Sequence, residues 1–374
     1  MGQVAQPELP PQLGGTWDRF REEWCLEQDL ALPRDQVVRS LNAVARHSPQ
    51  KISRVASGGT RGPSVICPLV ELGDLFEAAE RVPYFNRVLE QINRDERSAY
   101  AELVLVAALV KSGFPASFED GKSRPDAVTT VDGTPIAFEV YVPDRAEKSK
   151  AQMEFIHEIS ARLRRAVADC RVEVDVHEDD VGIVSADSFV EAAKAAPASS
   201  WVQVGRSSRL RRIDQGEPLL PQFDGDGPTT YVGGQVKRQL GGFYAIVRAS
   251  VDDGRAREKL EEKRSQLNAD IANVVVINVN EVGGISDWPA KLAESLGDDF
   301  DKVGAVVFFD QGVGGPPEGI RRRWMVLVNN KAIRAIPEHL LASFERISYR
   351  PPGVAPSPRL TAPAEPADAT GSNP

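Results

Sequence analysis

Three carboxylates between residues 102 and 139 have the types and spacing of a divalent-metal site. Asp126 and Glu139 lie on either side of the dipeptide Asp132-Gly133, and Glu102 precedes them. Asp-Gly between two short β-branched runs predicts a β-hairpin, which brings Asp126 and Glu139 toward one end of a sheet. Carboxylate oxygens are the ligands that Mg²⁺ and Mn²⁺ prefer. The three residues therefore predict a site for a hard divalent cation.

Glu102 is the only charged residue in the apolar run from Ala99 to Val110, which predicts a largely buried helix. An unpaired buried carboxylate costs several kcal/mol. Glu102 thus needs a cation, a hydrogen-bond network or an exit to solvent. The plain alternative is a glutamate at the helix edge that pairs with a nearby arginine, together with a surface hairpin whose outer face is acidic.

Strand alternation divides the second half of the hairpin between two faces. One face carries Ile136, Phe138, Val140 and Val142, and the other carries Ala137, Glu139 and Tyr141. Glu139 is therefore expected on the face opposite the larger apolar side chains.

A helix that carries a glutamate is followed by Pro125-Asp126 and then by the strand segment Glu139-Val140-Tyr141. On these features the chain resembles the PD-(D/E)xK nuclease superfamily over about residues 95–180. The resemblance implies an α/β (α+β) fold with a restriction-endonuclease-like mixed β-sheet flanked by helices. It also implies Mg²⁺- or Mn²⁺-dependent hydrolysis of phosphodiester bonds in nucleic acid, in DNA rather than RNA, in defence or DNA processing. A homodimer is a further expectation. Glu102, Asp126 and Glu139 would be the catalytic metal ligands.

Tyr141 occupies the position of the lysine in this motif. In the family that lysine is thought to position the attacking water, whereas a tyrosine has a pKa of about 10 and supplies no positive charge. Lys148 and Lys150 on the next helix, or Lys263 on a later one, could replace it. Otherwise the domain is a catalytically inactive nuclease-fold module for nucleic-acid or protein interaction. A third alternative is an α/β protein without nuclease activity whose acidic residues are surface groups.

Clusters of basic residues indicate where phosphates could be contacted. The predicted nucleic-acid-binding residues are Lys122, Arg124, Arg206, Arg209, Arg211 and Arg212, and Arg321 to Arg323 form a second arginine cluster. The alternative is a solvated loop with local salt bridges. Glu173, Asp175 and His177 share one face of a predicted strand; they are read as the solvated face of an edge strand, with metal ligation as the alternative.

Composition limits the class of protein. The 374 residues carry a net charge of −9, so bulk charge does not favour nonspecific nucleic-acid binding. Three cysteines far apart in the sequence fit a reducing cytoplasm. The first residues lack the pattern of a secretory signal, and no apolar run is long enough to span a bilayer. A soluble cytoplasmic protein with no membrane partner is expected.

The chain is expected to consist of four parts. Residues 1–15 are a disordered arm, 16–95 a helical N-terminal region, 96–350 a nuclease-like α/β domain with a Gly/Pro-rich insertion at about 197–245, and 351–374 a disordered tail. Within the α/β domain we expect helices at 98–110, 145–168, 189–196, 252–268 and 288–296. We expect strands at 116–119, 172–176, 273–279, 303–309 and 324–328, in addition to the hairpin.

Overall fold

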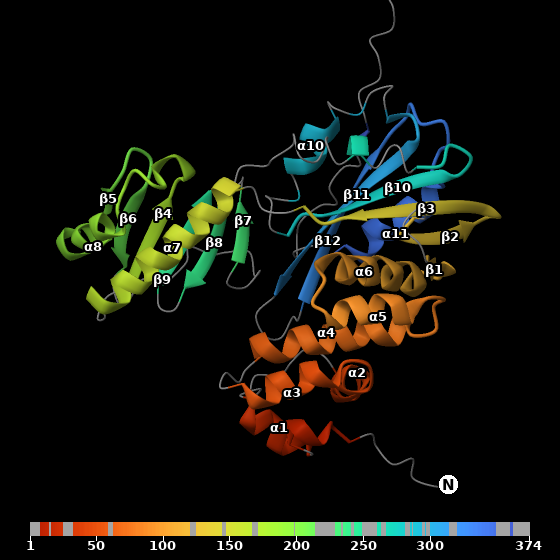
Figure 1. The fold of residues 1–374 in the computed structure, drawn as a ribbon, viewed down its shortest axis with the longest axis horizontal. Helices are drawn as coiled ribbons and strands as arrows, with labels where there is room; N and C mark the ends of the chain where they lie inside the picture. Colours follow the sequence, from red (N-terminus) through yellow and green to blue (C-terminus); the bar gives the residue numbers. More distant parts are fainter. Residues whose placement is uncertain are drawn as a thin grey trace, which may run out of the picture.

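A computed structural model describes the protein over residues 8–14, 16–24, 33–58, 63–119, 125–143, 147–166, 171–197, 199–213, 229–232, 235–240, 243–248, 260–262, 267–280, 285, 287–293, 296, 300–313, 320–348 and 360–361. These residues form a seven-stranded sheet and a six-stranded sheet, each with its own helices (Figure 1). The expected mixed α/β class is confirmed.

The described residues between 16 and 95 are mainly helical, as expected for this region, and form α1 Trp17–Glu23, α2 Arg34–His47, α3 Pro49–Ser57, α4 Pro63–Ala79 and α5 Phe85–Asn93. A short 3-10 turn, Pro11–Leu13, precedes them. Leu9 and Leu13 are both buried in the same apolar cluster as Phe20. The expectation of a disordered arm is therefore wrong for residues 8–14, because two leucines four positions apart anchor that segment to the core.

The larger sheet has the strand order β1-β2-β3-β10-β11-β12-β13. Its strands are β1 Ala116–Phe118, β2 Ala127–Val131, β3 Thr134–Tyr141, β10 Ala272–Asn278, β11 Val303–Val313, β12 Ile320–Val328 and β13 Leu360–Thr361. β3, β10 and β11 run parallel to one another, whereas the β1-β2, β2-β3 and β11-β12 pairs are antiparallel. β13 adds to β12, so the two residues 360–361 are paired rather than disordered as expected for the tail.

Helices cover both faces of this sheet. α6 (Arg97–Lys111) lies along one face, while α10 (Asp287–Ala293) lies on the other (Figure 1). α11 (Glu338–Ile347) packs on β12 and had no counterpart among the sequence predictions. Parallel strands that are buried on both faces need continuous apolar runs, and every residue of β10 is buried.

The end of α6 confirms the predicted glycine cap. Gly113 has a φ of 86°, its N–H donates to the Val110 carbonyl (3.0 Å), and the Phe114 N–H donates to the Leu109 carbonyl (3.0 Å). These two bonds form a Schellman motif, which needs a left-handed residue at Gly113. The motif stops the helix and directs the chain into β1.

The smaller sheet belongs to a separate unit with its own apolar core. It comprises α7 Glu147–Ala166, α8 Ala186–Ala195 and the strands β4 Arg171–Val176, β5 Trp201–Gln203, β6 Arg209–Ile213, β7 Thr229–Val232, β8 Gln235–Leu240 and β9 Phe243–Arg248. Its strand order is β5-β6-β4-β9-β8-β7. Ile159, Val174 and Phe189 are buried together in this unit, apart from the larger sheet's core. The insertion is therefore larger than the predicted 197–245 and begins with α7.

A loop in the smaller unit is organised around Asp180, which is 1% exposed. Its carboxylate accepts hydrogen bonds from the main-chain N–H groups of Arg206 (2.9 Å), Ser207 (2.8 Å) and Ser208 (2.6 Å). Burial alone would raise the pKa of Asp180, but the hydrogen bonds from these residues outweigh it, so the pKa lies below its usual value. The ionised carboxylate thus holds residues 206–208 in place.

Substitution of Gly73 tests a close crossing of two helices, α2 and α4, in the N-terminal region. A Cβ at Gly73 on α4 would overlap the main chain of Ser40 on α2. We expect Gly73→Ala to lower the free energy of unfolding by about 3 kcal/mol, since the two helices must separate. Gly113→Ala has open space around the new methyl group, so only its positive φ costs energy, about 1 kcal/mol. Urea unfolding compares them, and equal losses would contradict the packing argument.

The Asp180 loop predicts a pH dependence of stability. Because the folded-state pKa is depressed, the stabilisation is fully present above the unfolded pKa of about 3.9 and is lost as pH falls through the lower folded value. We expect Asp180→Asn to cost about 2 kcal/mol at pH 7 and progressively less below about pH 4. Urea unfolding at several pH values measures this difference. The exposed neighbour Asp179→Asn is the control, and a pH-independent Asp180→Asn penalty would overturn the assignment.

Candidate functional site

The predicted hairpin is formed by β2 and β3. Asp132 and Gly133 have φ values of 50° and 79°, which are the left-handed values that a two-residue type I′ turn requires. Ala127 pairs with Phe138, so the two strands are in register up to the residue that follows Asp126. The turn chemistry therefore fixes the pairing that carries the acidic residues to the far end of the hairpin.

Asp126 is attached to the main chain of β3 on both sides of Glu139. The Asp126 N–H donates to the Phe138 carbonyl (2.9 Å), and the Asp126 Oδ2 accepts from the Val140 N–H (2.7 Å). Glu139 is 3% exposed, whereas Asp126 is half-buried. The hairpin thus brings these two carboxylate residues together where β3 lies beside β10.

The two faces of β3 differ as the sequence alternation predicts. Phe138 and Val140 belong to the core beneath α6, whereas Tyr141 packs against the core on the opposite face. Glu139 alternates with Phe138 and Val140, so it points toward the face of Tyr141. Glu102 comes from α6, on the other face of the sheet.

Glu102 has an arginine partner. It is 4% exposed, and its Oε2 accepts from an Arg87 Nη on α5 at 2.7 Å. Among the described residues, no group of three His, Cys, Asp or Glu side chains is arranged to hold a metal ion. The structure therefore places two of the three predicted ligands, Asp126 and Glu139, side by side. The third, Glu102, pairs with an arginine, as the alternative interpretation expected. Arg87 lies fifteen residues upstream on another helix, so no local spacing signals the pair.

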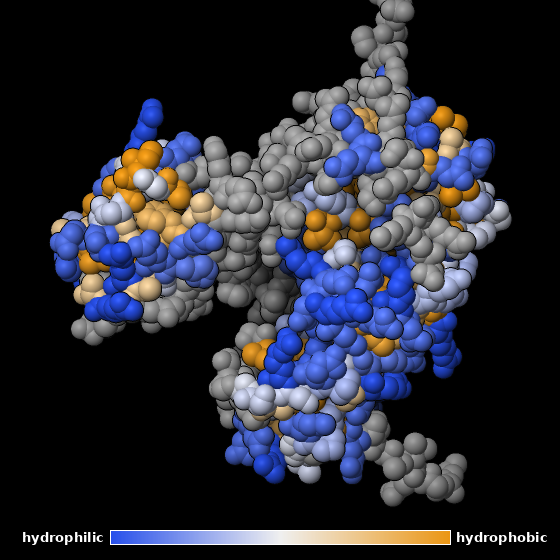
Figure 2. Space-filling view, in the orientation of Figure 1, coloured by the Kyte–Doolittle hydropathy of each residue, from blue (hydrophilic) through white to orange (hydrophobic). Residues whose placement is uncertain are grey.

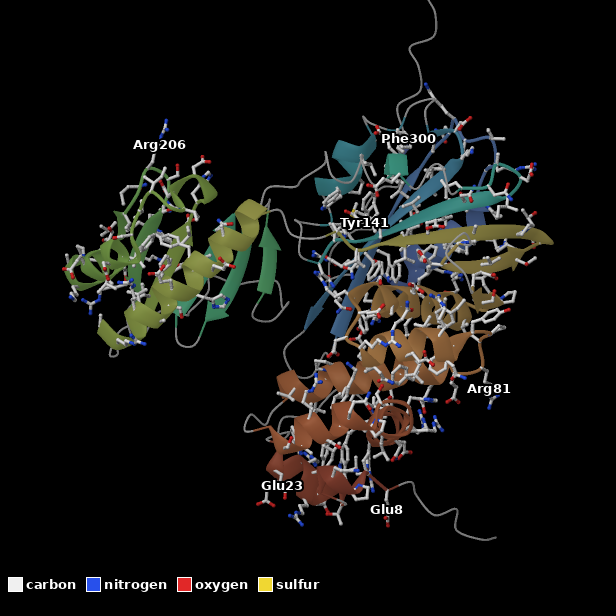
Figure 3. The ribbon with its side chains drawn as sticks, viewed as in Figure 1. Glu8, Glu23, Arg81, Tyr141, Arg206 and Phe300 are labelled. Atoms are coloured by element: carbon white, nitrogen blue, oxygen red, sulfur yellow. The ribbon has the colours of Figure 1, made fainter. Side chains whose placement is uncertain are left out.

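The lysines that could replace the lysine of the motif have no described side chains. Tyr141 is half-buried at the end of β3 (Figure 3). Lys148 and Lys150 lie in α7, but their side chains fall outside the description. Lys122, Arg124 and Lys263 also lie outside it.

The arginines of β6 are engaged by acidic residues of β4. In the antiparallel register Arg211 lies opposite Glu173 and Arg209 opposite Asp175, with ion-pair distances of 2.6 and 3.0 Å. Both guanidinium groups also lie over the Trp201 ring, at 5.3 and 4.4 Å from its centroid. These two arginines thus form local salt bridges, as in the alternative interpretation, but they lie on the strand β6 rather than in a solvated loop.

The position of β4 overturns the edge-strand expectation. β4 lies between β6 and β9, and Glu173 and Asp175 are at most 2% exposed. Charged side chains are tolerated on this interior strand because an arginine faces each of them.

The other two arginines of the first predicted cluster are also located. Arg206 is exposed at the outer end of the smaller unit (Figure 3), and Arg212 lies on β6.

The second predicted arginine cluster is also paired. Arg322 contacts Glu71 of α4, and Arg323 contacts Asp310 of β11, all within the larger unit. Arg321 has no described side chain. The Arg322–Glu71 pair connects the helical region with the sheet, the Arg323–Asp310 pair joins two neighbouring strands, and both pairs compensate the charge of an arginine.

Comparisons with protein-family models, with curated proteins and with solved structures gave no match to this chain. In the part of the chain that the structure describes, no helix combines the length and apolar character needed to cross a membrane. The site is therefore interpreted from its own geometry.

The Arg87–Glu102 pair can be tested by stability. Arg87→Met removes a partner of a buried carboxylate and should lower the free energy of unfolding by about 2 kcal/mol. Adding Glu102→Gln should restore a large part of the loss, because the buried charge is removed. Urea unfolding measures both, with Arg81→Met on the exposed surface as the control. A loss no larger than that of the control would contradict a structural ion pair.

Proposed function

We propose that this chain is a Mg²⁺- or Mn²⁺-dependent nuclease-like protein that hydrolyses phosphodiester bonds in DNA. The observation that carries the proposal is the attachment of the Asp126 carboxylate to the β3 main chain beside Glu139. Two acidic residues that are thirteen positions apart become neighbours through a tight turn and two hydrogen bonds. RNA is the less favoured substrate.

The donor set fits a hard cation. Mg²⁺ in phosphate-processing enzymes is commonly bound by one or two carboxylates together with water and substrate phosphate oxygens. Asp126 and Glu139 supply two carboxylates, and no third protein ligand is required. Their position near the ends of parallel strands is where α/β proteins commonly bind ligands.

The order of elements supports the resemblance in the motif. α6 is followed by the antiparallel strands β1, β2 and β3, and β10 then joins β3 in parallel. This is a mixed sheet flanked by helices, as a restriction-endonuclease-like domain requires. The smaller unit would be an insertion between β3 and β10.

Each residue has a separate role in this proposal. Asp126 and Glu139 would bind the cation, which when bound lowers the pKa of water and neutralises charge on the scissile phosphate. The Val140 N–H orients the Asp126 carboxylate. The Tyr141 hydroxyl, or Lys148 or Lys150, would orient the attacking water. Glu102 would stabilise the fold through Arg87 rather than serve as a catalytic group.

A second candidate is a nuclease-fold module without catalytic activity that binds nucleic acid or protein. It is favoured by the arginine partner of Glu102 and by Tyr141 at the motif's lysine position. Both features weaken charge stabilisation at the reacting phosphate.

Cleavage of plasmid DNA with Mg²⁺ or Mn²⁺ separates the two candidates. We expect Asp126→Asn and Glu139→Gln to reduce the cleavage rate at least about 100-fold, because a bound metal contributes several kcal/mol to transition-state stabilisation. Asp132→Asn is a matched control, since it makes the same change in the same hairpin at a turn position that also accepts asparagine.

Each outcome has a defined meaning. Equal cleavage by the wild type and both site variants would reject Asp126 and Glu139 as the active site. No cleavage by the folded wild type on plasmid, single-stranded DNA or RNA would favour the inactive module. Glu102→Gln should retain the cleavage activity. If it reduces the cleavage rate as much as Glu139→Gln does, Glu102 is a metal ligand after all.

A further inference from the structure

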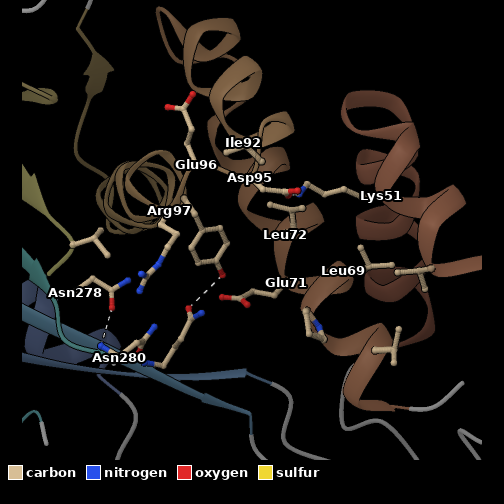
Figure 4. Close-up of a pocket in the computed structure, with 16 residues that line it drawn as sticks. Lys51, Leu69, Glu71, Leu72, Ile92, Asp95, Glu96, Arg97, Asn278 and Asn280 are labelled. Atoms are coloured by element: carbon tan, nitrogen blue, oxygen red, sulfur yellow. Dashed lines mark hydrogen bonds and ion pairs between the residues drawn. The ribbon is translucent and has the colours of Figure 1, made fainter. Parts of the chain in front are cut away.

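A pocket of about 520 Å³ lies at the carboxyl ends of the three parallel strands of the larger sheet (Figure 4). Val142 follows β3, Asn278 ends β10 with Asn280 two residues beyond it, and Gln311 lies near the end of β11. Helices α3 to α6 form the opposite side. In open α/β sheets, ligands bind in the crevice outside the carboxyl ends of the strands, and this volume is within the usual range for small-molecule sites.

Three amide side chains in the pocket are held with their oxygens occupied. Asn278 Oδ1 accepts from the Asn280 N–H (3.1 Å), and Asn280 Oδ1 accepts from the Gln311 N–H (2.5 Å). Gln311 Oε1 accepts from the Tyr100 hydroxyl (3.3 Å). Since the oxygens accept from the chain itself, the NH₂ groups are the donors that remain for a ligand.

Those donors have no acceptor within the described part of the chain, and Asn278 is only 7% exposed. A ligand that presents carbonyl oxygens or ring nitrogens to Asn278, Asn280 and Gln311 would accept the hydrogen bonds that water otherwise accepts from these pocket-lining amides.

The charges around the pocket compensate one another. Lys51 forms an ion pair with Asp95 at 2.5 Å, and Glu71 contacts Arg322, whose pKa is lowered to about 10 by burial and which stays protonated at pH 7. Glu96 and Arg97 add one charge of each sign. This balance favours a neutral ligand over a phosphate.

An apolar wall faces the amides. Leu69, Leu72 and Ile92 project from α4 and α5 across the pocket from Asn278 and Asn280 (Figure 4). The outer surface over α4 to α6 is mainly hydrophilic (Figure 2), so the apolar lining is a property of the pocket rather than of this region as a whole. An apolar wall opposite hydrogen-bonding groups is the arrangement that binds an unstacked nucleobase.

We propose that this pocket binds a single nucleobase, with Asn278, Asn280 and Gln311 donating to its acceptor edge and Leu72 and Ile92 against its ring. The choice of a nucleobase among neutral heterocycles rests on the proposed function. The pocket lies on the α6 side of the sheet, whereas Glu139 points to the other face, so base binding and cleavage use different residues.

Calorimetric titration of the full-length protein with free adenosine, guanosine, cytidine and thymidine tests the proposal without added metal. We expect at least one nucleoside to bind and inorganic phosphate not to bind. Asn280→Asp keeps the oxygen that accepts from Gln311 but removes the donor, so it should weaken binding about tenfold. Asn330→Asp makes the same change at an exposed position and should bind as the wild type does.

Two further arms cover the remaining outcomes. If Asn280→Asp is unfolded by circular dichroism, Val55→Phe narrows the half-buried wall and should abolish binding in a folded protein. A short single-stranded oligonucleotide tests whether the base must belong to a strand. If neither nucleosides nor the oligonucleotide bind, if both variants bind as tightly as the wild type, or if phosphate alone binds, the proposal is overturned.

The result is separable from the cleavage experiment. Asp126→Asn should bind nucleoside as the wild type does, because Asp126 does not line the pocket. Nucleoside binding without any cleavage would reject the nuclease proposal and retain the base site. Cleavage without nucleoside or oligonucleotide binding would retain the nuclease proposal and reject the base site.

Discussion

The larger unit depends on β3 being held between β2 and β10 with different requirements on its two faces. One face must supply Phe138 and Val140 to the core beneath α6, and the other must bury Glu139. A shift of one residue would exchange the faces and place the carboxylate against α6. The Asp132-Gly133 turn prevents this shift, because a two-residue turn permits only one pairing of the strands that it joins. The positions of Asp126 and Glu139 follow from that constraint.

In the part of the chain that the structure describes, several buried acidic residues are compensated by arginines of another helix or strand. Glu102 pairs with Arg87 across two helices, and Glu71 contacts Arg322 between a helix and a strand. Asp310 contacts Arg323 across an antiparallel ladder. The desolvation of such charges is costly, so each pair specifies a packing arrangement more than it adds stability. This explains why net charge and local spacing do not reveal which carboxylates are paired with arginines.

Features encoded in a continuous segment could be predicted from the sequence. The helix of residues 98–110, its glycine cap and the hairpin depend on neighbours within a few positions, and the structure has them. The partner of Glu102 and the interior position of β4 depend on contacts between distant segments. The separate core of the smaller unit was missed for the same reason, since its strands are short and connected by glycine-rich segments. α11 was missed although Leu340, Leu341 and Phe344 have helical spacing.

One of the missed contacts did have a sequence signal. Glu173 and Asp175 are spaced by two, as are Arg209 and Arg211, and alternation places each pair on one face of its strand. Such complementary spacing satisfies both charge pairs at once when the two strands lie side by side, and in an antiparallel pair the first acid then lies opposite the last arginine. That is the observed register. The acids of the hairpin are placed differently from those of β4. On β10 the residue paired with Glu139 is Val275, and Asp126 bonds to the β3 main chain on both sides of Glu139. The tight turn and the strand backbone therefore set these two acidic residues side by side, which is why the sequence could predict their proximity.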